Sequence, residues 1–389
     1  MPDSFVETTS TSWLSRIVQS ITGVLFGIVF VVGSIVLLFW NEGRAVQTAR
    51  SISEGGKVVV EAAPAPVDPS NEGKLIHVSG DAKAGTPISD RAFGVSATAL
   101  HLVRVAEMYQ WEEDKHQETH KSVGGSEQTV TTYTYKKVWS DRAIDSQTFR
   151  HPDGHANPQK QFGRLSLTAA DATLGAFKLG AAVLNLLPTS AALQLDPQAA
   201  DPLKPRIPNA QIVDGKIYIG PNADSPQIGD YKISYVYAPV GPVSSIGRQS
   251  GSGIAPYQTK AGDSLLLAVP GEQSAAEMFK QAERDNMILT WVLRLGGVLA
   301  MWLGTFLVLR PLVVVADVVP LIGSLIGAGA GLVALTFTMV VAGFVIALAW
   351  FWYRPLVGLA VLAAGLIAGI ALHRLAGRRS ATPAGAAAA

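Results

Sequence analysis

Long apolar runs lie at both ends of the chain, with a more polar region between them. Residues 17–40 carry no charge, and almost every residue from Ile288 to His373 is apolar, whereas residues 41–287 have the mixed composition of a soluble domain. A helix over residues 17–40 would extend about 36 Å, enough to cross a hydrocarbon core of about 30 Å with some tilt. The pattern predicts a membrane protein with one N-terminal span and a group of C-terminal spans.

A cleaved signal peptide is the alternative interpretation of the first apolar run. The apolar part of a signal peptide is shorter, about 7–15 residues, and small residues mark its cleavage site. Here Phe39 and Trp40 close the run, as interfacial aromatic anchors do. We therefore expect a short cytoplasmic N-terminus over residues 1–16 and an uncleaved transmembrane helix over residues 17–40.

The C-terminal apolar block predicts three further spans, over residues 288–309, 324–352 and 355–373. Residues 311–353 are too many for a single span, and two interpretations remain open. In the first, residues 310–323 form a re-entrant or interfacial segment; in the second, two tight spans meet near Gly331. The Ala-rich residues 374–389 are expected to be a disordered cytoplasmic tail.

About four spans would place both termini on the same side of the membrane. Arginines within residues 374–379 favour the cytoplasm for that side, which would leave residues 41–287 outside the cytoplasm. Arg44 and Arg50 lie just past the first span and oppose this orientation. The distribution of charge therefore does not decide the topology by itself.

The region of residues 41–287 is predicted to be a large mixed α/β, strand-rich extracytoplasmic domain with a core of its own. Alternation and a high content of Val, Thr and Tyr predict strands over residues 101–111, 129–139, 231–237 and 264–269. The first two would form a long hairpin around the turn in SVGGSEQ. Helical spacing predicts a helix over residues 173–187. Ser274 and Glu277 form a capping box that opens a second helix, expected to run into the second span.

Composition excludes several functional classes. Charged residues make up only 16% of the chain, against about 25% in ordinary soluble domains. The net charge of +1 gives no basic field for nucleic acid, and the absence of cysteine excludes disulfides and thiolate chemistry. No phosphate-binding loop, dinucleotide motif or catalytic triad pattern is present. We therefore predict that the protein is not an enzyme and has no cofactor.

Two pairs of histidines are spaced four residues apart, His116 with His120 and His151 with His155. On a helix such a pair shares a face and can bind zinc if a third ligand, such as Glu112, lies near. The first pair falls in the polar tip of the predicted hairpin, and a proline and a glycine interrupt the second. We expect solvated loop histidines and no metal site.

The stretch NEGR after the first apolar run is a candidate functional site. Either Gly43 ends the helix as a cap residue or the helix continues through it. Glu42 and Arg44 would then lie at headgroup depth, where they can pair with lipid phosphates or with Arg284 and Asp285. We predict a membrane-interface lock between the first span and the base of the domain, with a generic polar stop as the alternative. The lock would consist of Asn41, Glu42, Gly43 and Arg44.

Charges and glycines in the C-terminal block form two more candidate sites. A carboxylate at bilayer depth costs a few kcal/mol unless it is paired or hydrated. Asp317 lies two helical turns after Arg310, and Arg354 is a further candidate partner. The sequence leaves open whether these three residues form an intramembrane polar cluster or lie at the interface and only set the topology. Close helix packing, within a bundle or between subunits, is predicted at Gly327, Gly329 and Gly331.

Several long segments resemble, in the same order, segments of one known family. They are FWNEGRAVQTARSISEG from Phe39, GKLIHVSG from Gly73, FGVSATALHLVRVAEMYQWEE from Phe93, YQTKAGDSLLLAVPG from Tyr257, ADVVPLIGSLIGAGAG from Ala316 and WFWYRP from Trp350. On these residues the chain resembles the LUMA family, also called the transmembrane protein 43 family. The resemblance covers nearly the whole chain and implies four spans with the large domain outside the cytoplasm.

The resemblance also implies a function. Eukaryotic members are expected in the endoplasmic reticulum and inner nuclear membrane, where they self-associate and organise partners that include lamins and emerin. A bacterial member would have no lamina, so only self-association and residence in the plasma (inner) membrane would carry over. We expect a non-enzymatic integral membrane scaffold that forms a homo-oligomer and organises lipids or other membrane proteins. The alternative is a lipid-binding or transport protein that uses the helix bundle and the extracytoplasmic domain.

Overall fold

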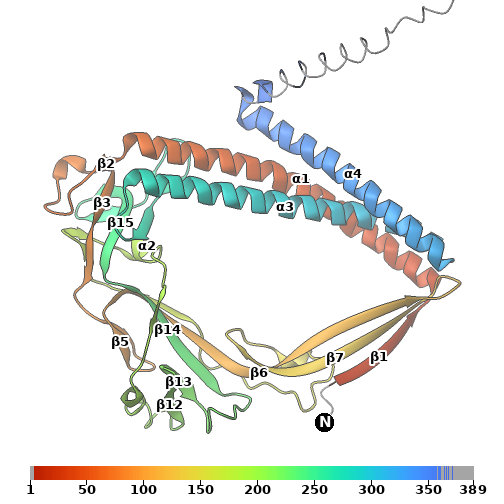
Figure 1. Ribbon diagram of the computed structural model, residues 1–389, viewed down its shortest axis with the longest axis horizontal. Helices are drawn as coiled ribbons and strands as arrows, with labels where there is room; N and C mark the ends of the chain where they lie inside the picture. Colours follow the sequence, from red (N-terminus) through yellow and green to blue (C-terminus); the bar gives the residue numbers. More distant parts are fainter. Residues whose placement is uncertain are drawn as a thin grey trace, which may run out of the picture. The chain divides into compact units, whose positions relative to one another are not determined.

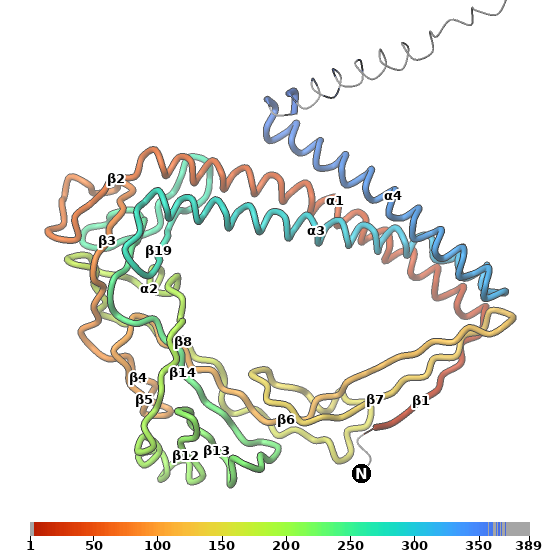
Figure 2. The backbone as a smooth tube through the Cα atoms, viewed as in Figure 1, coloured from red at the N-terminus to blue at the C-terminus, as the bar shows by residue number. Residues whose placement is uncertain are grey.

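The computed structural model describes residues 4–356, together with residues 358–360, 363, 365, 367 and 370 (Figures 1 and 2). The chain divides into two compact units, which we describe separately. The first unit contains residues 4–10, Arg50–His120 and Gln128–Arg284. The second contains Thr11–Ala49, Lys121–Glu127 and the described residues from Asp285 onward.

Three long helices dominate the second unit. They are α1 (Trp13–Val58), α3 (Ala275–Ala316) and α4 (Pro320–Tyr353), of which α1 and α3 also extend into the first unit. Each is long and apolar enough to cross a membrane. In the most apolar 18-residue segment of each helix, only 17–28% of the residues are buried inside the protein, so most of these side chains point outward. Helices that are apolar on all sides and lie at the surface are suited to a lipid environment.

Glycines bring α1 and α3 into their closest approach. A Cβ atom added to Gly27 would lie 2.6 Å from the carbonyl oxygen of Gly304, and one added to Gly304 would lie 2.8 Å from that of Gly27. Further along, Leu38 packs against Gly297, so the two helices are antiparallel. Small residues at a crossing let helix backbones approach closely, which increases van der Waals contact where no hydrophobic effect operates between helices.

Replacing Gly304 with leucine is expected to destabilise the bundle by about 1–3 kcal/mol, because the new side chain would collide with the backbone of α1. Thermal unfolding of the detergent-solubilised protein measures the change. Gly296→Leu is the matched control, since nothing lies within 4 Å of a Cβ atom at Gly296. Equal melting temperatures for the two variants would show that the glycine contact does not set the helix crossing.

The first unit is a strand-rich domain with two large sheets. The eight-stranded sheet has the order β1-β7-β6-β14-β13-β12, with β11 paired to β14 and β8 to β6. The seven-stranded sheet has the order β19-β15-β16-β10-β9-β3-β2, and β15 also pairs with β3. Two short hairpins, β4-β5 and β17-β18, complete the strands of the described residues.

The strands of the eight-stranded sheet are β1 (Ser4–Thr11), β6 (Ala99–Lys121), β7 (Glu127–Ser140), β8 (Leu165–Thr168), β11 (Ala191–Leu193), β12 (Ala210–Val213), β13 (Lys216–Ile219) and β14 (Tyr231–Pro239). Those of the seven-stranded sheet are β2 (Val60–Glu61), β3 (Leu75–Ala84), β9 (Ala172–Leu174), β10 (Phe177–Lys178), β15 (Gly241–Ser250), β16 (Gly253–Ala255) and β19 (Leu267–Pro270). The short hairpins are β4 (Ile88–Asp90), β5 (Val95–Ala97), β17 (Tyr257–Gln258) and β18 (Ser264–Leu265). One α-helical turn, α2 (Ala181–Leu184), and 3₁₀ turns at Pro69–Asn71, Ser146–Thr148 and Pro197–Ala200 connect them.

The main core of the first unit lies between the two large sheets. Met108 and Ile233 come from the eight-stranded sheet, whereas Val78 and Leu174 come from the seven-stranded one, and all four are buried in one cluster. A second cluster packs the ends of α1 and α3 within this unit against strands, through Ile52, Leu75, Ile246, Leu265, Met278 and Phe279. The domain therefore has a core of its own.

Most of the predicted strands are present. Residues 101–111 and 129–139 lie in β6 and β7, which form the expected long hairpin, and residues 231–237 lie in β14. The expected strand over residues 264–269 is divided between β18 and β19. The capping box is confirmed, because the backbone N–H of Ser274 donates to Glu277 at 2.9 Å and that of Glu277 donates to the Ser274 hydroxyl at 3.3 Å.

The helix expected over residues 173–187 is wrong except for the four residues of α2. Gly175 has a φ of +58°, which turns the chain and lets Phe177 pair with Leu174 in the β9-β10 hairpin. The apolar side chains of this segment reach the core from strands and a single helical turn. The apolar residues fall at helical spacing because glycines interrupt the apolar–polar alternation that is typical of strands.

The expected segment over residues 310–323 is not a separate element. Residues up to Ala316 continue α3 through Pro311, and α4 begins at Pro320, so a tight turn at residues 317–319 joins the two helices. Residues 320–353 form one continuous helix, which does not divide near Gly331. Of the fourth predicted span, residues 355–373, only part lies within the described residues, and the predicted tail over 374–389 lies outside them.

Candidate functional site

The predicted lock residues lie within an unbroken helix. α1 continues through Gly43, so the glycine does not cap it. A Cβ atom at Gly43 would lie 2.6 Å from the ring of Tyr353, which shows that the missing side chain makes room for α4. Phe39, one turn earlier, contacts the same ring at a centroid distance of 5.3 Å. Gly43 therefore serves helix packing.

Glu42 is the centre of a buried polar cluster. It is 2% exposed and accepts two hydrogen bonds from Arg294, from Nε at 2.6 Å and Nη2 at 2.8 Å. The indole Nε1 of Trp350 donates to the same carboxylate at 2.8 Å. The Arg294 guanidinium also lies 4.8 Å from the ring of Trp291. The bidentate ion pair and the adjacent aromatic ring compensate the two charges for the hydration that they lose on burial.

Asn41 and Arg44 join α1 to α3 beside this pair. The Asn41 amide donates to the carbonyl oxygen of Thr290 at 3.1 Å. Arg44 donates to Asn286 Oδ1 at 3.0 Å and to the Thr290 hydroxyl at 2.9 Å. These partners lie on the face of α3 that presents residues 286, 290 and 294 to α1 at helical spacing. The predicted role as a lock at the membrane interface stays a prediction.

A second buried polar cluster surrounds Asp317, in the turn between α3 and α4. Asp317 is 0% exposed. Arg16 of α1 pairs with it at 2.5 Å, and Lys121, the last residue of β6, pairs with it at 2.9 Å. Arg16 also pairs with Glu127 at 2.8 Å and donates to the carbonyl oxygen of Gly125 at 2.7 Å. This Asp317 cluster therefore brings together a helix terminus, an interhelical turn and a loop.

The polar cluster predicted from Arg310, Asp317 and Arg354 does not form. Asp317 is buried and paired as expected of an intramembrane carboxylate, but its partners are others. Arg310 is exposed and lines a cavity with Arg16. Arg354 follows α4 at its far end, about 51 Å of helix from Pro320, so it cannot reach Asp317.

Sequence reasoning missed Arg16, Lys121 and Glu127. Arg16 had a local signal, because it is a lone cation at the edge of the first apolar run. Lys121 and Glu127 flank the predicted hairpin turn, and nothing in the sequence around them indicates a contact with the helices. Lys121 lies 196 positions from its partner Asp317.

The predicted packing glycines have different surroundings. Gly327 faces α3, where a Cβ atom would lie 3.4 Å from Val313. Nothing lies within 4 Å of a Cβ atom at Gly329 or Gly331, although the carbonyl oxygen of Gly331 accepts a hydrogen bond from Trp302 at 3.2 Å. The close approach of two helix backbones lies elsewhere, at Gly27 and Gly304, and the spacing of Gly23 and Gly27 could have indicated it.

The histidine pairs do not form a metal site within the described residues, where no group of three or more potential ligands is found. The side chains of His116 and His120 are exposed, as expected, but lie on β6. His155 contradicts the expectation of a solvated loop, because it is 1% exposed and stacks on Tyr135 at 4.0 Å. Burial raises the pKa of Tyr135 to about 12, and its hydroxyl donates to Glu113 at 2.5 Å. The packing of these rings indicates a structural role.

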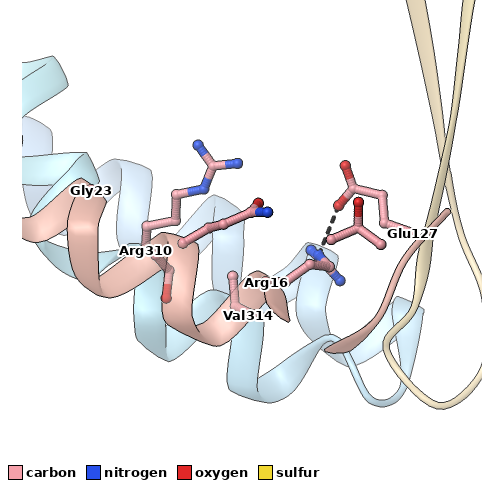
Figure 3. Close-up of a pocket in the computed structure, with 8 residues that line it drawn as sticks. Arg16, Gly23, Glu127, Arg310 and Val314 are labelled. Carbon is pink, nitrogen blue, oxygen red and sulfur yellow. Dashed lines mark ion pairs between the residues drawn. The ribbon is translucent and has the colours of Figure 1, made fainter. Parts of the chain in front are cut away.

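The described residues of the second unit enclose a polar cavity and an apolar one. The polar cavity, of about 180 Å³, is lined by Thr11, Arg16, Gln19, Ser20, Gly23, Glu127, Arg310 and Val314 (Figure 3). The apolar cavity, of about 360 Å³, lies among the three helices and is lined by Ile28, Val31, Val32, Thr305, Val308, Leu309, Val333 and Phe337. The second is large enough for part of an acyl chain or a bulky side chain.

Together, the three apolar helices and the two-sheet domain define a membrane protein with a β-rich domain. The family model of transmembrane protein 43 matches residues 108–355. The chain is 32% identical to transmembrane protein 43 of Homo sapiens, over 96% of this chain and 93% of that protein. It is also 32% identical to the Mus musculus protein, over 88% of each chain. The chain belongs to the transmembrane protein 43 family, which confirms the resemblance seen in the sequence.

More distant relatives fit the same assignment. The transmembrane protein 43 homolog of Drosophila melanogaster is 29% identical over 88% of this chain and 91% of that protein. No solved structure matches the chain. The matched region includes the β6-β7 loop, α3 and α4, so both polar clusters lie partly within it.

Proposed function

We propose that the protein is a non-enzymatic integral membrane scaffold that self-associates through α4 and organises membrane partners or lipids. The observation that carries this proposal is the open glycine face of α4. Among the described residues, no atom outside the helix's own backbone lies within 4 Å of a Cβ atom at Gly329 or Gly343. Leu332 and Val340, at helical spacing between them, are 67% and 66% exposed. The face therefore offers small residues at both ends and apolar side chains between.

A second copy of the same helix suits this face. Within lipid, helices associate through van der Waals packing, and glycines allow a partner backbone to approach closely. Flexible lipid tails fill the groove that a glycine leaves on a helix surface less well than a second helix of matching shape does. Membership of a family that is not known for enzymatic activity supports the non-enzymatic part of the proposal.

Disulfide crosslinking in membranes tests the proposal, since the chain has no native cysteine. Gly329→Cys and Gly343→Cys are each expected to form a crosslinked dimer on oxidation, because their side chains would face the second copy. Gly327→Cys is the matched control, two positions away and directed at Val313 of the same chain. Crosslinking that is absent at Gly329 and Gly343, or equal at all three positions, would contradict self-association through this face.

Lipid binding is a second candidate function. The apolar cavity of about 360 Å³ among α1, α3 and α4 favours it, because the cavity opens between helices that face lipid. Native mass spectrometry of protein released from nanodiscs tests it. A chain that keeps a phospholipid supports lipid binding, whereas a discrete oligomer without retained lipid supports only the scaffold.

A further inference from the structure

The segment that precedes α1 is part of the first unit. β1 is the edge strand beside β7 in the eight-stranded sheet. Phe5 stacks on His151 at a centroid distance of 4.2 Å and meets the ring of Tyr135 edge-on at 6.0 Å. Glu7 pairs with Arg150 at 2.8 Å. The chain before α1 therefore folds with the same domain as the chain after it.

Both ends of α1 are thus attached to one folded unit. The chain leaves this unit after Ser10 and re-enters it at Arg50. A water-soluble domain lies on one side of a membrane, so the residues between must cross the bilayer an even number of times. Two crossings need about 40 apolar residues and a turn between them, whereas α1 is one continuous helix from Trp13 to Val58. The only even number of crossings open to a continuous helix is zero.

The start of α1 contacts a loop whose flanking strand needs water. Arg16 pairs with Glu127 at 2.8 Å (Figure 3) and donates to the carbonyl oxygen of Gly125 at 2.7 Å. Residues 114–120, which lead into this loop along β6, are all exposed and include carboxylates and a lysine. Such a charged surface is costly in hydrocarbon. The loop and the start of α1 therefore lie on the side of the membrane from which β6 extends.

α3 and α4 meet the same condition. α3 begins within the first unit, and the residue that follows it, Asp317, pairs with Lys121 at 2.9 Å. Near the end of α4, the indole of Trp350 donates to Glu42 at 2.8 Å, two turns of α1 before the chain re-enters the first unit. Each of the three helices is therefore held at both ends by segments on the side of the domain.

The outer faces of the three helices suit the hydrocarbon of one leaflet. Val29 of α1, Val292 of α3 and Val340 of α4 are 67%, 59% and 66% exposed. A helix with its side chains is about 10–12 Å across, and one leaflet supplies about 15 Å of hydrocarbon, half of a core of about 30 Å. A helix that lies along the membrane keeps apolar side chains out of water without crossing the bilayer, as interfacial helices do.

We propose that α1, α3 and α4 bind a single leaflet of a lipid bilayer through these apolar faces and lie along the membrane, with residues 4–10 on the same side as the domain. The partner is the hydrocarbon layer itself. A first span over residues 17–40 would instead separate residues 4–10 from the domain by the whole bilayer and break the contacts of Phe5 and Glu7. The inference goes beyond the scaffold and does not depend on it, because two copies of α4 can also pack within one leaflet.

Sequential cysteine labelling tests this placement, since the chain has no native cysteine. The double variant Thr8→Cys with Ser225→Cys carries one thiol on β1 and one elsewhere in the first unit, both at exposed positions. The full chain in sealed vesicles of phosphatidylcholine and phosphatidylglycerol is treated with a membrane-impermeant maleimide and then, after permeabilisation, with a maleimide of different mass. Intact mass spectrometry reads both thiols of each chain, so the result is independent of the orientation in the vesicle.

Each chain is expected to carry two copies of one label, because both thiols would lie on the same side of the bilayer. Ser225→Cys with Ser252→Cys is the matched control, since both positions are exposed in the first unit and should carry like labels under either placement. Chains of the test variant that carry one copy of each label, while the control carries like labels, would overturn the proposal.

The depth of α1 gives a second readout that does not involve β1. Val18, Val29 and Val36 share one face of α1 and are 64%, 67% and 62% exposed. A fluorophore on a single cysteine at each position is quenched by lipids brominated at known depths, and equal depths are expected of a helix along the membrane. A fluorophore near the bilayer midplane at Val29, with those at Val18 and Val36 close to the two headgroup layers, would show a span and overturn the proposal. That outcome would leave self-association through α4 standing, since crosslinking measures it separately.

Discussion

Glu42→Ala is expected to destabilise the helix bundle by about 3–5 kcal/mol, the range for breaking a buried ion pair by removing one partner. The loss is large because the substitution leaves Arg294 charged, desolvated and without its bidentate partner. It also removes the acceptor of the Trp350 indole. Thermal unfolding in detergent measures the effect, and the variant should melt well below the unmodified chain.

The double variant Glu42→Leu with Arg294→Leu distinguishes the cost of leaving Arg294 unpaired from the cost of lost packing. Replacing a buried ion pair with apolar residues of similar volume is often neutral, so the double variant should melt well above Glu42→Ala and below the unmodified chain only by the lost acceptor of Trp350. If the double variant were as unstable as Glu42→Ala, the cluster would act through shape and hydrogen bonds, and the charge argument would be wrong.

Asp317→Leu is expected to cost about 3 kcal/mol by the same mechanism at the other end of the helices. Arg16 would keep Glu127 as a partner, whereas Lys121 would lose the carboxylate with which it pairs. The second measurement is proteolysis at the β6-β7 loop, since Lys121 connects that loop to Asp317. Cleavage within residues 121–127 should become faster.

Arg310→Leu is the control for Asp317→Leu. It removes a charge seven residues away on α3 without breaking an ion pair among the described residues. Its melting temperature in lipid-free detergent should therefore stay close to that of the unmodified chain. Unchanged stability and unchanged cleavage in Asp317→Leu would show that the Asp317 cluster does not hold the loop to the bundle.

Short sequence patterns correctly predicted the elements that are determined by neighbouring residues in the chain. The alternation over residues 101–111 predicted β6 because one face of that strand is buried, and the reciprocal hydrogen bonds of Ser274 and Glu277 follow from a four-residue motif. The helix expected over residues 173–187 failed for a physical reason. Apolar residues separated by glycines satisfy helical spacing, but Gly175 turns the chain into a hairpin.

The polar clusters depend on contacts that no local pattern contains. The sequence singled out Glu42 from its place just after the first apolar run, and Asp317 because a carboxylate within an apolar run is costly unless it is paired. It could not identify Arg294 for Glu42, since 252 residues separate them. Nor could it identify Arg16 for Asp317, where the separation is 301 residues. Three-dimensional packing alone selects among the available cations.

The pairing of Lys121 with Asp317 has a consequence for biosynthesis. The ribosome makes Lys121 long before Asp317, and 196 positions separate the two. During that interval α3 is still to be synthesised, so Lys121 cannot yet pair with Asp317. The pair can form only after residue 317 has left the ribosome. The ion pair therefore stabilises the completed chain and contributes nothing to the partly synthesised one.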